Sequence, residues 1–166
     1  DNMNDEKGQL SGEYMLLVGS LIVVLMISIF MIANENELNI AMAAAKSGAD
    51  EGVASSSSAI YPKETFNEYD DMEGLKHPYS VSIVNVSYNS SGIDENYGKQ
   101  KIQFKVYAKA SADYNKKELD SIGDRINYNL RKSVAMSFNT TDSTNKLYNP
   151  VFSNNYVFTT ANVVWV

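Results

Sequence analysis

The sequence predicts an α+β protein, in which a long N-terminal hydrophobic α-helix is followed by a β-rich globular head with one further helix. Residues 14–33 carry no charged side chain. Residues 79–110 contain two segments with the β-branched, aromatic and alternating pattern of strands. Residues 115–136 carry apolar side chains at helical spacing. We therefore divide the 166 residues into a leader-like segment at 1–8, a transmembrane helix at 9–60 and an outer head domain at 61–166.

The uncharged segment at residues 14–33 is long enough to cross a lipid bilayer. Twenty helical residues cover about 30 Å, the thickness of the hydrocarbon layer. The segment is apolar on every face, so it belongs in lipid or in an equally apolar protein interior. A secretory leader has a shorter apolar region and a small-x-small cleavage site, whereas this segment runs into Asn34 and Glu35. We expect a helix that is retained, with only Lys7 before it to bias its orientation.

The helical pattern continues beyond the apolar segment. Residues 35–54 contain no proline and are rich in alanine, the best helix former. Small and apolar residues form one stripe there, which permits close approach of another element: Leu38, Ala41, Ala45, Ala49 and Val53. We predict one helix from Gln9 to about Ala54, weakest at Gly12 and Gly19 because glycine costs about 1 kcal/mol against alanine. The alternative is a membrane helix followed by a separate juxtamembrane helix.

The head begins with two predicted antiparallel strands. Residues 79–88 form the first strand, and residues 89–98 are rich in turn-forming residues and predict a loop. Residues 101–110 alternate, so that four side chains face the core and the lysines face water: Ile102, Phe104, Val106 and Ala108 point inward.

A helix and a short β region complete the predicted head. Asn115 and Glu118 have the spacing of a capping box before a helix at 115–136. Its apolar stripe is formed by Leu119, Ile122, Ile126, Leu130 and Val134. Residues 139–155 predict a polar loop, and strands follow at 156–159 and 161–166. The last of these is apolar on both faces, so we expect it inside the sheet.

Composition excludes several classes of function. The net charge of −6 lies in residues 1–60, while the head has equal numbers of acids and bases and no basic patch for nucleic acid. The absence of cysteine excludes disulfides and thiolate metal sites. His77 has no ligand pattern around it, and the acidic turns at 70–73 and 94–95 fit no EF-hand loop. We expect no enzyme, no cofactor and no metal site, because no Ser/His/Asp constellation, phosphate loop or nucleotide fingerprint is present.

The N-terminal segment carries a recognisable motif. Residues 7–17 read K-G-Q-L-S-G-E-Y-M-L-L, which resembles the processing site of archaeal type IV prepilins of the class III signal-peptide group. The pattern Gln-x-Ser-x-Glu before a hydrophobic helix is met by Gln9, Ser11, Glu13 and Leu17. The resemblance covers about thirty residues by motif, and no residue of the head carries it.

This resemblance implies a function and a set of partners. A membrane prepilin peptidase would cleave between Gly8 and Gln9, and the hydrophobic helix would remain on the mature subunit. The pilus assembly machinery would then move the subunit from the membrane into a helical homopolymer, an extracellular filament on the cell surface whose use is adhesion. Many archaeal pilin and archaellin heads are mainly β, so the predicted helix at 115–136 is a departure from them. Two alternatives stay open: a single-pass membrane protein whose outer domain binds a ligand or partner, and a minor pseudopilin.

Glu13 is the candidate assembly residue. The resemblance places it at the fifth position of the mature chain, next to the uncharged segment. A carboxylate in apolar surroundings costs several kcal/mol unless it is paired. The new α-amine of Gln9, on the same or a neighbouring subunit, would supply the partner. The alternative is a glutamate that stays solvated at the membrane edge.

Three N-x-S/T motifs are candidate glycosylation sites, at Asn85, Asn89 and Asn139. Chance alone accounts for their number in a chain rich in Asn, Ser and Thr. Asn89 and Asn139 lie in predicted loops, whereas Asn85 lies within a predicted strand, where it is the poorer acceptor.

Overall fold

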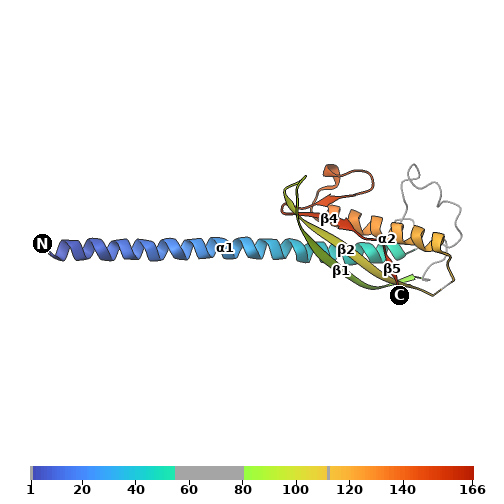
Figure 1. The fold of residues 1–166 in the computed structure, drawn as a ribbon, viewed down its shortest axis with the longest axis horizontal. Helices are drawn as coiled ribbons and strands as arrows, with labels where there is room; N and C mark the ends of the chain where they lie inside the picture. Colours follow the sequence, from blue (N-terminus) through green and yellow to red (C-terminus); the bar gives the residue numbers. More distant parts are fainter. Residues whose placement is uncertain (1, 55–80, 112) are drawn as a thin grey trace. The chain divides into compact units, whose positions relative to one another are not determined.

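The computed structural model describes residues 2–54, 81–111 and 113–166, and it confirms the α+β class (Figure 1). It contains two compact units, Asp1–Leu38 and Asn39–Val166. The elements follow in chain order: α1 (Asn2–Val53), β1 (Val81–Asp94), β2 (Lys99–Ala110), α2 (Lys116–Ser137), the 3-10 turn η4 (Thr141–Ser143), β3 (Val151–Phe152), β4 (Tyr156–Thr160) and β5 (Val164–Trp165).

Helix α1 is a single α-helix throughout Asn2–Val53. The prediction of one continuous helix is therefore confirmed. The described part of the chain does not contain the alternative, a membrane helix followed by a separate juxtamembrane helix. The helix begins before the expected Gln9, because residues 2–8 contain no proline to prevent helix formation. It ends one residue before Ala54, next to the serines at 55–58.

Strand β2 is the centre of the sheet. It pairs antiparallel with β1 on one side, and on the other side it pairs in parallel with β4 and β5, while β3 pairs with β4. The inward alternation predicted for β2 is confirmed, since the exposed fractions of its four core side chains are at most 1%. The Phe104 ring stacks on Phe158 of β4 with 5.6 Å between centroids, and Phe138 stacks on the same ring at 5.8 Å.

The predicted loop at residues 89–98 is wrong over its first part. β1 continues to Asp94, and the pairs Asn89↔Gln103 and Asp94↔Lys99 belong to the ladder. Hydrogen bonding to β2 overrides the turn propensity of this Asn- and Ser-rich sequence. Gly92, at φ 84°, lies in the register shift between Ser90 and Ile93, and the true turn is residues 95–98.

The expectation of an interior C-terminal strand is also wrong. β5 has only two residues, it pairs with β2 at Tyr107 and Ala108, and its side chains are half-buried. β4 occupies the adjoining edge of β2 at Gln100–Phe104, which leaves β5 a short stretch of free ladder. The apolar pattern of residues 163–166 therefore reflects packing beside α2 as well as strand pairing.

Helix α2 follows its predicted pattern. Its N-cap residue, Asn115, accepts a hydrogen bond from the Glu118 amide at 2.8 Å. Four residues of the predicted stripe are almost fully buried, Ile122, Ile126, Leu130 and Val134, whereas Leu119 is only half-buried. The Asn127 amide donates to the Ala161 carbonyl at 2.9 Å, which ties α2 to the segment between β4 and β5.

The loop between α2 and β3 is held by a few polar contacts. The Arg131 guanidinium donates to the Leu147 carbonyl at 3.2 and 3.3 Å and to Thr160 Oγ1 at 2.7 Å. The rings of Tyr128 and Tyr148 lie 5.6 Å apart. Burial and the Tyr148 phenol raise the pKa of Tyr128 above its ordinary value of 10.0 against the opposing charge of Arg131, so this phenol stays neutral at physiological pH.

The C-terminal part of α1 packs backbone to backbone against α2. A Cβ added to Gly48 would lie 2.8 Å from the Leu130 Cα, and one added to Gly52 would lie 2.7 Å from the Ile126 Cα. The Gly52 carbonyl accepts a 3.0 Å hydrogen bond from Arg125 Nε. Ala41, Ala45 and Ala49 are fully buried. The predicted small-residue stripe thus permits the close approach expected of it.

We predict that Gly48→Ala destabilises the head by about 1–3 kcal/mol, because the added methyl group meets backbone atoms that cannot rotate away. The neighbouring Ser47 is exposed, so Ser47→Ala is the matched control and should change stability by less than about 0.5 kcal/mol. Thermal unfolding of the detergent-solubilised full chain, followed by near-UV circular dichroism, measures both. Equal melting temperatures for the two variants would contradict the backbone contact.

Candidate assembly and membrane segment

The first unit of the chain exposes a large apolar surface. Fifteen large hydrophobic side chains between Tyr14 and Ile32 are exposed, among them Leu16 at 75% and Phe30 at 62%. Each such side chain gains about 1.5–3 kcal/mol when it is fully buried, so together they cannot be left in water. By length and composition this part of α1 can cross a membrane. Residues 14–32 therefore need lipid or other apolar helices around them.

The polar side chains inside this segment are compatible with an apolar environment. Ser20 Oγ donates to the Leu17 carbonyl and Ser28 Oγ donates to the Val24 carbonyl, each at 2.8 Å. Both hydroxyl protons are thus satisfied by the helix's own backbone and need no water. Gly12 and Gly19 have open space where a Cβ would lie, so neither glycine is required by a contact within the subunit.

The motif residues all lie on α1. Gln9, Glu13 and Leu17 follow at four-residue steps and so share one helix face, whereas Ser11 lies on another. The side chains of Ser11, Glu13 and Leu17 are exposed. The predicted cleavage point, Gly8 and Gln9, lies in helical backbone outside the described side chains. Glu13 is thus a charged group at the end of a wholly apolar surface.

The three glycosylation candidates have exposed side chains in the head. Asn85 and Asn89 both lie on β1, so the expected loop position of Asn89 is wrong, because β1 is longer than predicted. Asn85 sits beside the register shift that follows Ile83. Asn139 lies just beyond α2 with a positive φ of 54°. Exposure makes all three accessible to a modifying enzyme and does not distinguish among them.

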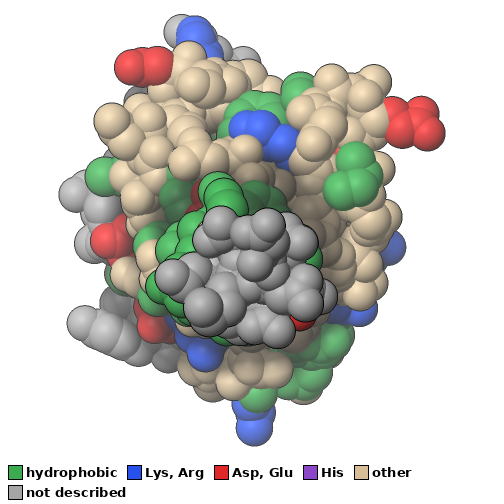
Figure 2. Space-filling view, turned by 90° about the vertical axis from the view of Figure 1, so that its left-hand side faces the viewer, with side chains coloured by type: hydrophobic (Ala, Val, Ile, Leu, Met, Phe, Trp, Pro, Cys, Tyr) green, Lys and Arg blue, Asp and Glu red, His purple; other side chains and the backbone are tan. Residues whose placement is uncertain are grey.

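One face of the molecule carries no single charged patch (Figure 2). Figure 2 shows Lys, Arg, Asp and Glu side chains scattered over the visible face among uncharged polar ones. Among the described residues no group of three or more His, Asp or Glu side chains could hold a metal ion. Asp94 Oδ1 accepts from the Asn96 amide at 2.9 Å and so serves the turn. The acidic residues at 70–73 and His77 lie outside the described residues.

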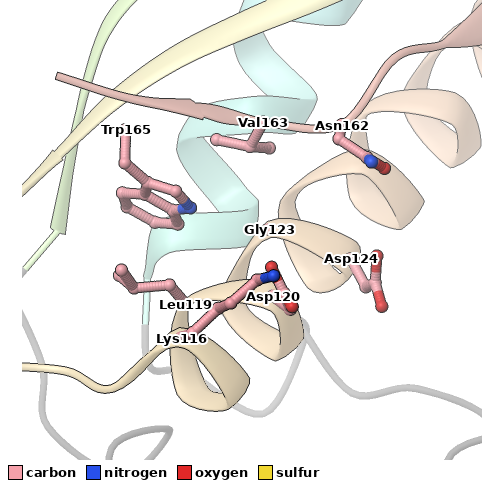
Figure 3. A pocket seen from close by; sticks show the side chains of 8 residues that line it. All are labelled: Lys116, Leu119, Asp120, Gly123, Asp124, Asn162, Val163 and Trp165. Carbon is pink, nitrogen blue, oxygen red and sulfur yellow. The ribbon is translucent and has the colours of Figure 1, made fainter.

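Sequence patterns did not reveal one feature of the head, a cavity of about 380 Å³ between α2 and residues 162–165 (Figure 3). Asp120 and Asp124 are four residues apart on α2, which a helical pattern could have placed on one face. Asn162 and Trp165 come from the C-terminal end of the chain, and only the fold brings them there.

We predict that the double substitution Leu21→Arg/Leu25→Arg moves the protein out of the membrane. Each arginine near the middle of the segment costs about 2.5–3.5 kcal/mol of insertion free energy. The control is Asn39→Arg/Ser47→Arg, which adds the same charge at exposed positions outside the apolar segment. Alkaline extraction of membranes measures the fraction retained. Equal retention of the two variants would show that residues 11–32 do not anchor the chain.

The chain matches no protein-family model, and no curated protein or solved structure is significantly similar to it.

Proposed function

We propose that this protein is the structural subunit of an archaeal type IV pilus-like extracellular filament, which polymerises through its N-terminal hydrophobic helix. The observation that carries the proposal is the exposed apolar surface of residues 14–32 directly after the Gln9-x-Ser11-x-Glu13 motif. A helix that bound one partner would need one apolar stripe, whereas a helix inside a bundle has neighbours all around it. The same surface lets lipid store the subunit before assembly.

In the proposed polymer the subunits are identical, and one surface of each subunit binds a different surface of the next. Such heterologous contacts close into a ring only for special rotations and otherwise give an open helical filament. In this proposal the apolar helices form the filament core, and the heads form its outer surface. A prepilin peptidase supplies the mature subunit and the pilus assembly machinery moves it out of the membrane. Adhesion to a surface is the use that the resemblance implies.

Glu13 has a specific task in this proposal. Moving it into the filament core costs several kcal/mol unless it meets a positive charge. Cleavage after Gly8 creates such a charge, the α-amine of Gln9, one helical turn before Glu13 on the same face. Pairing within one subunit or between neighbours would fix the axial register of the helices. The Gln9-x-Ser11-x-Glu13 motif is thus what favours a filament over a simple membrane anchor.

A second candidate function is a single-pass membrane protein whose outer domain binds a ligand. The cavity beside Trp165 favours this candidate, since it gives the head a place for a small molecule. The apolar helix would then be only an anchor, and Glu13 a solvated residue at the membrane edge.

We predict that Glu13→Ala leaves the protein in the membrane but lowers the amount of sheared filament at least about tenfold, because an unpaired Gln9 α-amine remains in the core. The matched control is Glu51→Ala, an exposed glutamate of the same helix within the second unit. Electron microscopy and immunoblotting of sheared material provide the measurement. Normal filament yield from the Glu13 variant would rule out the pairing.

We predict further that the main band of sheared material begins at Gln9. N-terminal sequencing together with electron microscopy tests this directly. Fibres whose subunit begins at another residue would support the polymer but refute cleavage between Gly8 and Gln9. Protein found only in membranes, without fibres, would refute the filament and favour the anchored protein.

A further inference from the structure

The cavity between α2 and the C-terminal segment is a built feature of the head. Two backbone hydrogen bonds to β2 fix the segment, from Ala161 N to the Phe104 carbonyl at 2.8 Å and from Val166 N to the Ala108 carbonyl at 2.9 Å. On the other side, Gly123 has no side chain, and a Cβ placed there would lie only 3.3 Å from the Val163 Cβ. Both walls therefore belong to regular structure or are bonded to it, and they approach each other closely at Gly123 and Val163.

The side chains around the cavity differ in kind from end to end. In Figure 3 the Trp165 indole and Leu119 lie at one end, and the Asn162 amide and the Asp124 carboxylate lie at the other. The Asp120 carboxylate and the Lys116 ammonium come from the same face of α2. One aromatic side chain thus lines the same cavity as hydrogen-bond acceptors and donors, within about 380 Å³, a volume in the ordinary range for small-ligand pockets.

The chemistry of the side chains that line the cavity indicates which class of ligand fits it. Lys116 and Asp120 lie one helical turn apart and carry opposite charges, and Asp124 already has an interaction within the structure. A polyamine or an anion such as phosphate therefore finds no uncompensated charge of the opposite sign in the cavity. A purely apolar ligand would cover part of this polar lining without offering it hydrogen bonds. A neutral sugar satisfies each group, because its C–H face packs on an indole, its hydroxyls donate to carboxylates, and its oxygens accept from an ammonium or an amide.

We propose that this cavity binds a neutral sugar unit, as a monosaccharide or disaccharide of a glycan, with Trp165 as the stacking platform and Asp120, Lys116 and Asn162 as its polar contacts. This binding function goes beyond the filament role and does not depend on it. A head presented by a filament or by a membrane anchor would attach to glycans through the same cavity.

The chain offers a direct probe of this site, because Trp165 is its only tryptophan. The full-length protein is kept in a zwitterionic detergent without a sugar headgroup, since a maltoside or glucoside would compete. Tryptophan fluorescence is titrated with glucose, galactose, mannose, N-acetylglucosamine, lactose and maltose. We expect at least one of these sugars to change the fluorescence saturably.

Two exposed positions test whether the response comes from the cavity. Asp120→Ala and Asn162→Ala each remove a hydrogen-bonding group without opening the core, and each should weaken sugar binding about tenfold. Glu95→Ala, an exposed acid in the turn between β1 and β2, is the matched control and should leave the affinity unchanged. Near-UV circular dichroism confirms that the variants are folded.

Three results would each overturn the proposal. The first is that none of the six sugars changes the fluorescence saturably. The second is that Asp120→Ala, Asn162→Ala and the unchanged protein bind the sugar with equal affinity, and the third is that spermidine or inorganic phosphate saturates the response in place of the sugars. Each of these readouts is independent of filament formation, so a failure here is distinguishable from a failure of the proposed assembly.

Discussion

The approach of two helix backbones at Gly48 and Gly52 is the contact on which the head depends. At these positions α1 has no side chain, so the backbone of α2 at residues 126–130 takes the space that a side chain would fill. The Arg125 hydrogen bond to the Gly52 carbonyl adds a polar contact at the same level. Helix α2 then carries its own buried stripe and the Asn127 contact that holds the segment after β4. The position of the cavity beside Trp165 follows from this arrangement.

Helix α1 has small buried side chains in the second unit and large exposed side chains in the first. In the second unit its buried residues are alanine and glycine, which allow close packing within one subunit. In the first unit α1 exposes fifteen large apolar side chains between Tyr14 and Ile32. Large side chains gain most when other helices or lipid cover them. The same helix therefore stabilises one folded head and presents a surface for association.

Strand β2 organises the rest of the head. Its four buried side chains provide the sheet's contribution to the core, and both of its edges are used, by β1 on one side and by β4 and β5 on the other. Parallel pairing of β2 with β4 requires a long connection between them, and α2 lies within that connection. Because β4 and β5 share one edge, the chain between them leaves the sheet at residues 161–163. That departure places Asn162 and Val163 against α2.

The sequence by itself determined the features that arise from local periodicity. The uncharged segment, the inward residues of β2, and the cap and stripe of α2 could all be read from neighbouring residues, because one face of each element is buried and the pattern repeats with its period. The position of Glu13 directly before the uncharged segment also followed from the sequence. The head's pairings could not be found this way. Asn- and Ser-rich residues 89–94 join a strand only because β2 offers hydrogen bonds to them, and the final apolar residues form a short edge strand because β4 already occupies the adjoining edge. Tertiary structure alone placed Trp165 opposite Asp120, since the two residues are brought together by backbone pairing and helix packing over a long sequence separation, for which no local pattern exists.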